Sequence, residues 1–167
     1  MINGASGGVG TFALQMAKIY EADITAVTSE RNSDWIKNDF KINDVIDYTK
    51  DDILSTDNKY DIIFDANGNL SFPKVSKILS ANGIYVSTKN NIYNNIDVAK
   101  QLFQRKKSRV VLSGRTSTAN LDLFRMWIED GKIKPIIDKI FSFDKYLDAY
   151  KHLSSGRAKG KIILTID

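Results

Sequence analysis

Short apolar runs alternate along most of the chain with segments whose apolar positions recur at helical spacing. Five runs have the composition expected of strands: 23–30, 43–48, 60–68, 84–88 and 108–114. Four segments before, between and after them have the apolar spacing of helices: 10–20, 31–40, 72–83 and 94–106. We expect the helix over 72–83 to end at Gly83, because glycine commonly follows the last helical turn.

The last part of the chain keeps this alternation less strictly. A helix is expected over 118–133, stopped at Gly131, and it is followed by an extended segment over 134–143. A second helix over 144–156 and a final strand over 159–167 complete the pattern. Because no repeat or linker interrupts the chain, we interpret residues 1–167 as one domain with a helix–strand extension from about 143 to 167.

Strands that alternate with helices at this spacing form βαβ units, in which helices cover a parallel sheet. We therefore expect an α/β fold of the Rossmann type, a doubly wound parallel sheet in three layers. In the usual strand order of that fold, 3-2-1-4-5-6, the first strand is central. Here it is truncated to the stub Met1, Ile2 and Asn3.

Composition narrows the class of protein. Hydrophobic residues make up 43% of the chain and charged residues 26%, which is typical of a globular domain. We see no apolar window long enough for a membrane span and no signal-like segment, so we expect a cytoplasmic protein with no membrane partner. With no cysteine and one histidine, His152, a zinc site is not expected. The net charge is +4, and the basic run over 105–109 lacks interleaved aromatic residues, so no nucleic-acid partner is expected.

The start of the chain is rich in glycine, with Gly4, Gly7, Gly8 and Gly10 in seven positions. A glycine-rich turn between a strand and a helix is typical of dinucleotide binding, because the helix start directs unpaired N–H groups at a pyrophosphate. Gly7 and Gly8 would let the backbone approach the phosphates, and Gly10 would let the helix pack closely on the strand. Ala5 stands where the G-x-G-x-x-G pattern has its first glycine.

The end of the second strand bears on the choice of cofactor. A carboxylate there usually holds the ribose of NAD, whereas a hydroxyl and a guanidinium suit the 2′-phosphate of NADP. Ser29 and Arg31 favour NADPH, while Glu30 between them leaves NADH as the alternative.

The stretches NGASGGVGTFALQMAK, AVTSERN and VIDY, with the closing GKIKPIID and LSSGRAKGKIILTI, resemble the cofactor domain of the medium-chain dehydrogenase/reductase superfamily, to which the zinc-type alcohol dehydrogenases belong. The nearest branch is the zinc-free NADPH:quinone oxidoreductase group, and the resemblance covers essentially the whole chain. It implies cofactor contacts at the pyrophosphate from Ser6, Gly7, Gly8 and Val9, at the 2′-phosphate from Ser29 and Arg31, at the adenosine from Tyr48, at the nicotinamide half from Asn67, Gly68, Val86 and Ser87, and from the returning Arg157, Ala158 and Lys159. It assigns no catalytic residue.

Some of these residues have a plainer interpretation. Tyr48 could be an aromatic side chain at a strand end, and Arg157 and Lys159 could be surface charges beside a loop.

The resemblance also implies an activity and a missing part. Enzymes of this group transfer a hydride from NADPH to a quinone, an enone or another carbonyl substrate, and a preceding catalytic domain supplies most of their substrate pocket. No such domain precedes the glycine-rich turn here, so we expect a truncated gene product, an excised domain or one part of a split protein, with little turnover alone. The resemblance further implies a homodimer that forms through the edge strand Arg109–Ser113.

Two other functions remain open from the sequence. A short-chain dehydrogenase would use Gly4, Gly8 and Gly10 and a Tyr-x-x-x-Lys pair, which Tyr85 and Lys89 match in spacing. That segment alternates like a strand, however, which would hold the two side chains apart. A non-catalytic NADPH sensor or a partner subunit would need the cofactor site alone.

Overall fold

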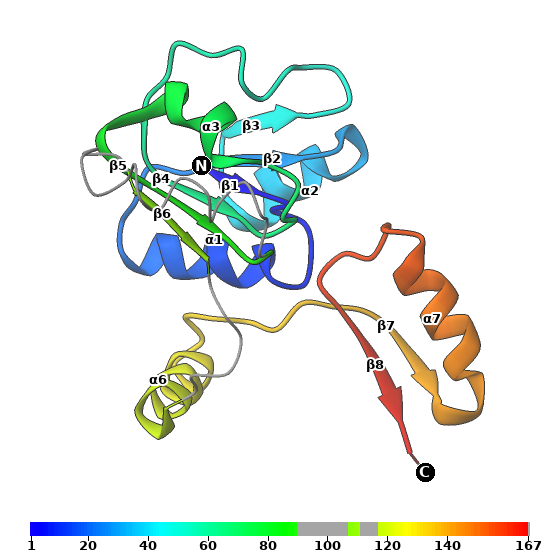
Figure 1. Ribbon diagram of the computed structural model, residues 1–167. Helices are drawn as coiled ribbons and strands as arrows, with labels where there is room; N and C mark the ends of the chain where they lie inside the picture. The colour runs from blue at the N-terminus through cyan, green and yellow to red at the C-terminus, as the bar shows by residue number, and fades with distance from the viewer. Residues whose placement is uncertain (90–106, 111–116, 167) are drawn as a thin grey trace.

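The computed structural model describes residues 1–89, 107–110 and 117–166 (Figure 1). The main sheet has six strands in the order β3-β2-β1-β4-β5-β6, and every neighbouring pair is parallel. Its strands are β1 (Ile2–Asn3), β2 (Thr25–Thr28), β3 (Asp44–Asp47), β4 (Tyr60–Asp65), β5 (Leu79–Ser87) and β6 (Lys107–Val110). This order confirms the predicted Rossmann topology, with the short β1 at the centre of the sheet.

Helices cover both faces of this sheet. On one face lie α1 (Gly10–Ile19) and α2 (Glu30–Phe40), whose Leu14 and Ile36 are fully buried against β1 and β2. On the other face lie α3 (Phe72–Val75) and the 3₁₀ turn η1 (Ser76–Ile78). Two separate apolar clusters therefore form, one under each face, which gives the expected three layers.

The helix predicted over 72–83 is wrong in its second half. The helical segment ends at Ile78, and Leu79 already begins β5, where it pairs with Tyr60 of β4. Gly83 lies inside this strand, and a Cβ placed on it would come within 2.9 Å of the Tyr60 carbonyl oxygen. Glycine is present here because two strands approach closely, and not because a helix ends.

Two other expected elements lie partly or wholly outside the described residues. The helix predicted over 94–106 is one of them. The predicted edge strand, Arg109–Ser113, is described only as far as Val110, where β6 pairs with β5 on one side.

The last third of the chain forms α6 (Thr118–Glu129) and a small unit of its own. In that unit β7 (Ile137–Ser142) and β8 (Lys161–Thr165) pair in parallel, and the turn η2 (Phe143–Lys145) and α7 (Tyr146–Ser154) connect them. We call residues 137–165 the C-terminal unit. It stands beside the main sheet in Figure 1 and adds no strand to it.

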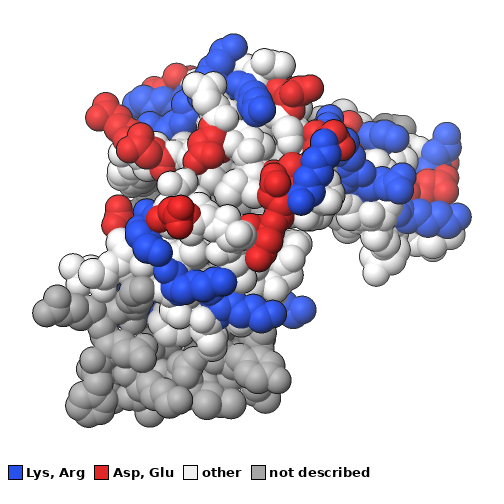
Figure 2. Space-filling model, turned by 90° about the horizontal axis from the view of Figure 1, so that it is seen from above, with Lys and Arg blue, Asp and Glu red and all other residues white. Residues whose placement is uncertain are grey.

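The surface of the described residues carries charges of both signs. Figure 2 shows lysine and arginine side chains interspersed with aspartate and glutamate on the face seen from above. Within the described ranges, no helix has the length and apolar character needed to cross a membrane.

Candidate functional site

The carboxyl ends of the parallel strands meet along one edge of the main sheet. Asn3, the last residue of β1, pairs with Val27 on one side and with Asp65 on the other. Asp65 in turn pairs with Ser87, the last residue of β5. The sequence-predicted residues at or just beyond these strand ends are brought to this edge: Ser6, Gly7, Gly8, Val9, Ser29, Arg31, Tyr48, Asn67, Gly68, Val86 and Ser87.

The glycine-rich turn over residues 4–9 connects β1 to α1 tightly. The Gly7 N–H donates to the Gly4 carbonyl at 3.1 Å, and the Thr11 N–H donates to the Gly7 carbonyl at 3.0 Å. Gly4 adopts a φ of +78°, which glycine reaches without steric cost. A Cβ on Gly10 would lie 2.1 Å from the Gly4 carbonyl oxygen, so the helix starts against the turn with no room for a side chain. This packing agrees with the role predicted for Gly10.

The start of α1 is suited to an anion. Its first turn contains no acidic residue, and Val9 at the N-cap offers no side chain that caps the helix. The first N–H groups of a helix have no intrahelical acceptor, and the helix dipole is positive at this end. Because the turn carries hydrogen in place of Cβ atoms, a phosphate group can approach these N–H groups closely.

Ser6 connects the glycine-rich turn to the second strand and helix. Its Oγ lies 3.0 Å from Thr28 Oγ1 and 3.0 Å from Asn32 Nδ2, both of which donate to it. Thr28 and Asn32 are buried, so this cluster fixes the turn against β2 and α2. The Oδ1 of Asn32 has no hydrogen-bond partner among the described residues, which leaves a buried acceptor free beside Ser6. These features fit a polar ligand such as a dinucleotide.

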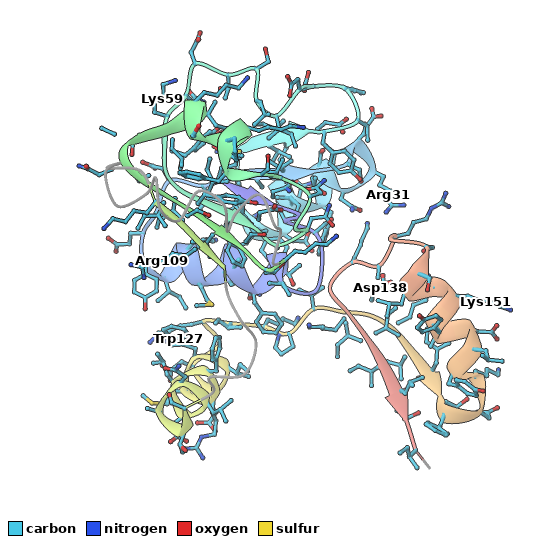
Figure 3. The ribbon with its side chains drawn as sticks, in the orientation of Figure 1. Arg31, Lys59, Arg109, Trp127, Asp138 and Lys151 are labelled. Carbon is cyan, nitrogen blue, oxygen red and sulfur yellow. The ribbon has the colours of Figure 1, made fainter. Side chains whose placement is uncertain are left out.

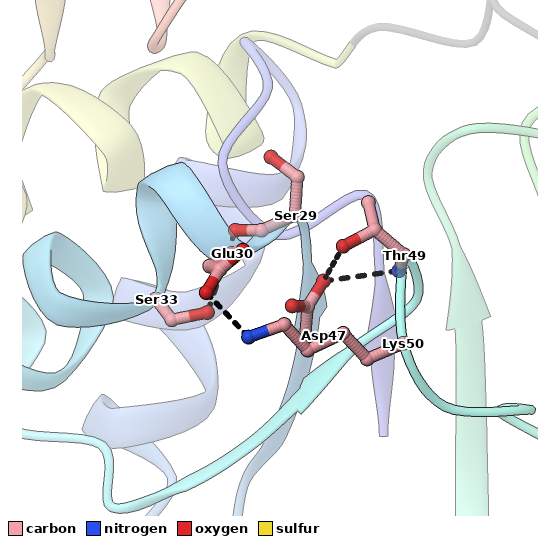
Figure 4. Close-up of polar contacts among 6 residues, drawn as sticks. All are labelled: Ser29, Glu30, Ser33, Asp47, Thr49 and Lys50. Atoms are coloured by element: carbon pink, nitrogen blue, oxygen red, sulfur yellow. Dashed lines mark hydrogen bonds and ion pairs between the residues drawn. The ribbon is translucent and has the colours of Figure 1, made fainter.

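The end of β2 brings Ser29, Glu30 and Arg31 to the same edge. Ser29 precedes α2 in an extended conformation and makes no capping hydrogen bond with its side chain. Glu30 accepts a hydrogen bond from Lys50, as Figure 4 shows, and this contact raises the pKa of Lys50. Arg31 extends toward the C-terminal unit, where its Nη2 donates to the Gly156 carbonyl at 3.3 Å (Figure 3).

Tyr48 lies just beyond β3. Its N–H donates to the Thr28 carbonyl at 3.1 Å, and its side chain is exposed. The neighbouring Asp47 accepts hydrogen bonds from the Oγ1 and the N–H of Thr49, and the side-chain bond is the main reason that the pKa of Asp47 is lowered (Figure 4). Tyr48 is therefore held by its backbone, with its ring free to face a ligand.

A buried carboxylate that the sequence analysis missed organises the next part of the edge. Asp65 is fully buried at the end of β4, and its Oδ1 accepts from Asn3 Nδ2 at 2.7 Å and from the Gly68 N–H at 2.8 Å. Its Oδ2 accepts from the Leu70 N–H at 2.9 Å and from the Tyr85 hydroxyl at 3.0 Å. The loop that carries Asn67 and Gly68 is thus anchored to the sheet by one side chain. The only sequence signal was an aspartate at a strand end.

The same contacts remove the basis for a short-chain dehydrogenase. Tyr85 lies inside β5, fully buried, and its hydroxyl is engaged by Asp65 and by the Leu70 carbonyl. Lys89 lies beyond the strand and is exposed. The two side chains therefore do not form the exposed helical pair that such an enzyme needs.

The returning segment contacts the glycine-rich turn through its backbone. Gly160 donates its N–H to the Ser6 carbonyl at 3.0 Å and pairs with Gly7 as a parallel bridge. Of the three residues predicted there, Arg157 is exposed, Ala158 is half-buried, and Lys159 places its Nζ 5.4 Å from the centre of the Trp35 ring. Gly160 was not among the predicted site residues.

The described residues offer no metal site, since no group of three or more His, Cys, Asp or Glu side chains among them could hold an ion. His152, the histidine of the C-terminal unit, instead lies with its Nε2 at 2.6 Å from Asp138 Oδ2. Both side chains are largely buried, and this contact connects α7 to β7.

Known proteins resemble this chain over nearly its whole length. Residues 40–164 match the family model described as zinc-binding dehydrogenase. A zinc-type alcohol dehydrogenase-like protein of Schizosaccharomyces pombe is 31% identical over 100% of this chain, and the match covers 51% of that protein. The mitochondrial NAD(P)H oxidoreductase RTN4IP1 of Bos taurus is 30% identical over 99% of this chain and 47% of its own length.

A solved structure shows the same architecture. The quinone oxidoreductase of Coxiella burnetii superposes with a TM-score of 0.85 at 24% identity, covering 99% of this chain and 52% of that one. At this identity the likeness is one of fold. The chain thus spans about half the length of the relatives that it matches.

Proposed function

Because the chain belongs to the zinc-binding dehydrogenase family, we propose that it is the NADPH-binding part of a reductase that acts on a quinone, an enone or another carbonyl compound. A nicotinamide dinucleotide-binding domain is what this family model and the relatives support. The observation that carries the proposal is the glycine-rich turn, which meets the start of α1 at the carboxyl edge of a sheet with Rossmann order.

The glycine-rich turn would hold the pyrophosphate. Ser6, Gly7, Gly8 and Val9 form its outer side, and the positive end of α1 lies directly behind them. Gly7 has its nearest neighbour, the Gly4 carbonyl oxygen, 3.4 Å from the position a Cβ would take, so this side of the turn is open. Cofactor binding therefore depends mainly on backbone N–H groups, which a change of side-chain charge elsewhere would not alter.

The charges near β2 favour NADPH over NADH. Glu30 is the carboxylate that could repel a 2′-phosphate or hold a ribose, but it is paired with Lys50. Ser29 and Arg31 remain near it, one as a short hydroxyl and the other as a guanidinium that makes one long hydrogen bond to a carbonyl. A guanidinium binds a phosphate dianion more strongly than a neutral carbonyl, so Arg31 can exchange Gly156 for the cofactor. Tyr48 would lie against the adenosine.

The nicotinamide half would lie over the ends of β4 and β5. Asn67 is exposed there, Gly68 adopts a φ of +67°, and Val86 and Ser87 form the end of the adjacent strand. The bound cofactor would supply the hydride, while these residues would orient its ring and keep one side of it from water. Arg157, Ala158 and Lys159 would contact the cofactor from the C-terminal side.

The substrate pocket would be completed by a part of the protein that is not in this sequence. The match covers about half of each relative, and the edge described above supplies a cofactor site without an enclosing wall for a substrate. The family description includes zinc, but the described residues hold no set of ligands for it, and the proposal involves no metal. We expect the 167-residue chain to bind NADPH with little turnover.

The proposal includes a homodimer. The strand β6 pairs with β5 along one side, with Arg109 opposite Val86 and Val110 opposite Ser87. A strand at the edge of a sheet has unpaired N–H and carbonyl groups, and a second copy can satisfy them by extending the sheet. Sedimentation equilibrium of the chain should therefore give the mass of two copies.

Calorimetric titration with NADPH and NADH tests the proposed cofactor. The chain should bind both and prefer NADPH, and Arg31→Ala should remove that preference by weakening NADPH alone. Loss of one charge-assisted hydrogen bond predicts a change of about tenfold in the NADPH dissociation constant. Arg125→Ala is the matched control, because Arg125 lies on α6 and pairs only with Asp122. An unchanged preference in Arg31→Ala would place the 2′-phosphate elsewhere.

A further inference from the structure

The start of β8 is attached directly to the glycine-rich turn. The Gly160 N–H donates to the Ser6 carbonyl, and the next N–H, that of Lys161, donates to the Ile136 carbonyl at 2.8 Å. Gly160 has a φ of +79°, and a Cβ on it would lie 2.4 Å from the Ile136 carbonyl oxygen. The backbone on both sides of Lys161 is therefore fixed relative to the turn.

This attachment carries the Lys161 side chain over Gly8. A Cβ placed on Gly8 would lie 3.0 Å from Lys161 Cδ and 3.1 Å from its Nζ. The absence of a side chain at Gly8 thus makes room for a lysine from the other end of the chain. Sequence reasoning assigned Gly8 only to the approach of a phosphate, and it did not single out Lys161.

The ammonium group of Lys161 has no counter-charge among the described residues. Other lysines of this chain have partners: Lys50 pairs with Glu30, Lys132 with Asp130, and Lys151 with Asp148. No carboxylate within the described ranges forms an ion pair with Lys161, and it lies against the turn at the positive end of α1, whose first turn lacks acidic residues. Two positive features side by side are unfavourable unless an anion lies between them.

We propose that Lys161 binds the pyrophosphate of the dinucleotide and closes the glycine-rich turn from the C-terminal unit. The inference rests on the proposed function, since it assigns a further residue to the same cofactor site. The pyrophosphate would then be held from two sides, by backbone N–H groups of the turn and by a single ammonium group. Arg31 would read the 2′-phosphate separately, so Lys161 serves NADPH and NADH equally.

Titration of the full 167-residue chain with NADPH and with NADH tests this assignment, with Lys161→Met and Lys139→Met compared to wild type. Lys139 is the control because it is an exposed lysine on the neighbouring strand β7, opposite Ile162. Lys161→Met keeps the apolar stem and removes the charge. It should weaken both cofactors by about tenfold, as expected for one charge-assisted hydrogen bond, and Lys139→Met should weaken neither.

Several outcomes decide the matter. Equal loss for NADPH and NADH in Lys161→Met, with recovery in Lys161→Arg and an unchanged melting temperature, supports the assignment. Wild-type affinity in Lys161→Met overturns it while leaving the proposed function intact, and so does an equal loss in Lys139→Met. Absence of binding to wild type overturns the proposed function and this assignment together. If Lys161→Met is unfolded, Lys161→Gln and Lys161→Arg are compared, and equal affinity of these two overturns the assignment.

Discussion

At Gly10 the packing of single atoms decides whether the site can form. A Cβ there would meet three backbone atoms of Gly4 and Ala5 at 2.1 to 2.8 Å, and backbone cannot move aside as a flexible side chain can. Gly10→Ala should therefore lower the free energy of unfolding by about 2–3 kcal/mol, the cost of severe overpacking, which denaturant melts would measure. Gly7→Ala is the matched control, since its Cβ would have its nearest contact at 3.4 Å. Similar stability for the two variants would contradict this packing.

Asp65 is the second residue on which the edge depends. Each of its oxygens accepts two hydrogen bonds, so the amide nitrogen of Asp65→Asn would face two donors in either orientation. We expect a loss of roughly 2–4 kcal/mol in unfolding free energy, because a buried charged acceptor is removed and its donors are left unpaired. Asp61→Asn, on the exposed side of the same strand, should change stability by less than about 0.5 kcal/mol. Equal melts for the two variants would contradict the role of Asp65.

These two residues differ in how far sequence could reveal them. The glycine pattern was interpretable because positions 4–10 are adjacent in the chain, and a tight turn into a helix needs glycine locally. The Asp65 network joins Asn3 to residues more than sixty positions later, so it depends on which strands become neighbours. No local pattern contains that information. The same reason explains why Lys161 was not singled out.

At the scale of elements, the alternation of strands and helices was predictable wherever one pattern alone fitted. Residues 31–40 and 43–48 agree closely with α2 and β3. In 72–83 the apolar Val75, Ile78 and Leu79 fit a helix as well as a strand start, and pairing with Tyr60 decides in favour of a strand after Ile78. An extended segment and a final strand were expected at the end of the chain, but their pairing with each other, outside the main sheet, was not foreseen.

The attachment of the C-terminal unit depends on one glycine. Gly160→Ala would combine a positive φ with a Cβ only 2.4 Å from a carbonyl oxygen, whereas Gly156→Ala has a similar φ with no atom within 4 Å. Both variants should lose about 1 kcal/mol from backbone strain, and Gly160→Ala about 2 kcal/mol more from the clash. Hydrogen exchange over 160–165 should rise only in Gly160→Ala. The same exchange in both variants would show that β8 is not held by this contact.

For the whole molecule, large apolar surfaces of the C-terminal unit remain uncovered. Ile140, Leu147 and Tyr150 are 61%, 59% and 68% exposed, which is unusual for such side chains gathered in one unit. The relatives are about twice as long as this chain, and the part that they add is our proposed cover for these residues.

This incompleteness predicts the behaviour of the isolated chain. Assays that follow NADPH absorbance should show little or no quinone reduction by the chain alone, because nothing in the described edge excludes water from the nicotinamide. Addition of the amino-terminal half of a related enzyme is the natural complement to this assay. Reduction by the chain alone at ordinary enzymatic rates, about 1 per second or faster, would contradict the proposed division of the enzyme.

The central claim is that backbone N–H groups at the start of α1 grip a pyrophosphate. Amide chemical shifts of the ¹⁵N-labelled chain, recorded during NADPH titration, measure those groups directly. Our account predicts that the amides of Ser6, Gly7, Gly8 and Val9 shift most, and that they saturate together with the amide of Lys161. Saturable shifts confined to other parts of the chain, with these amides unmoved, would contradict it.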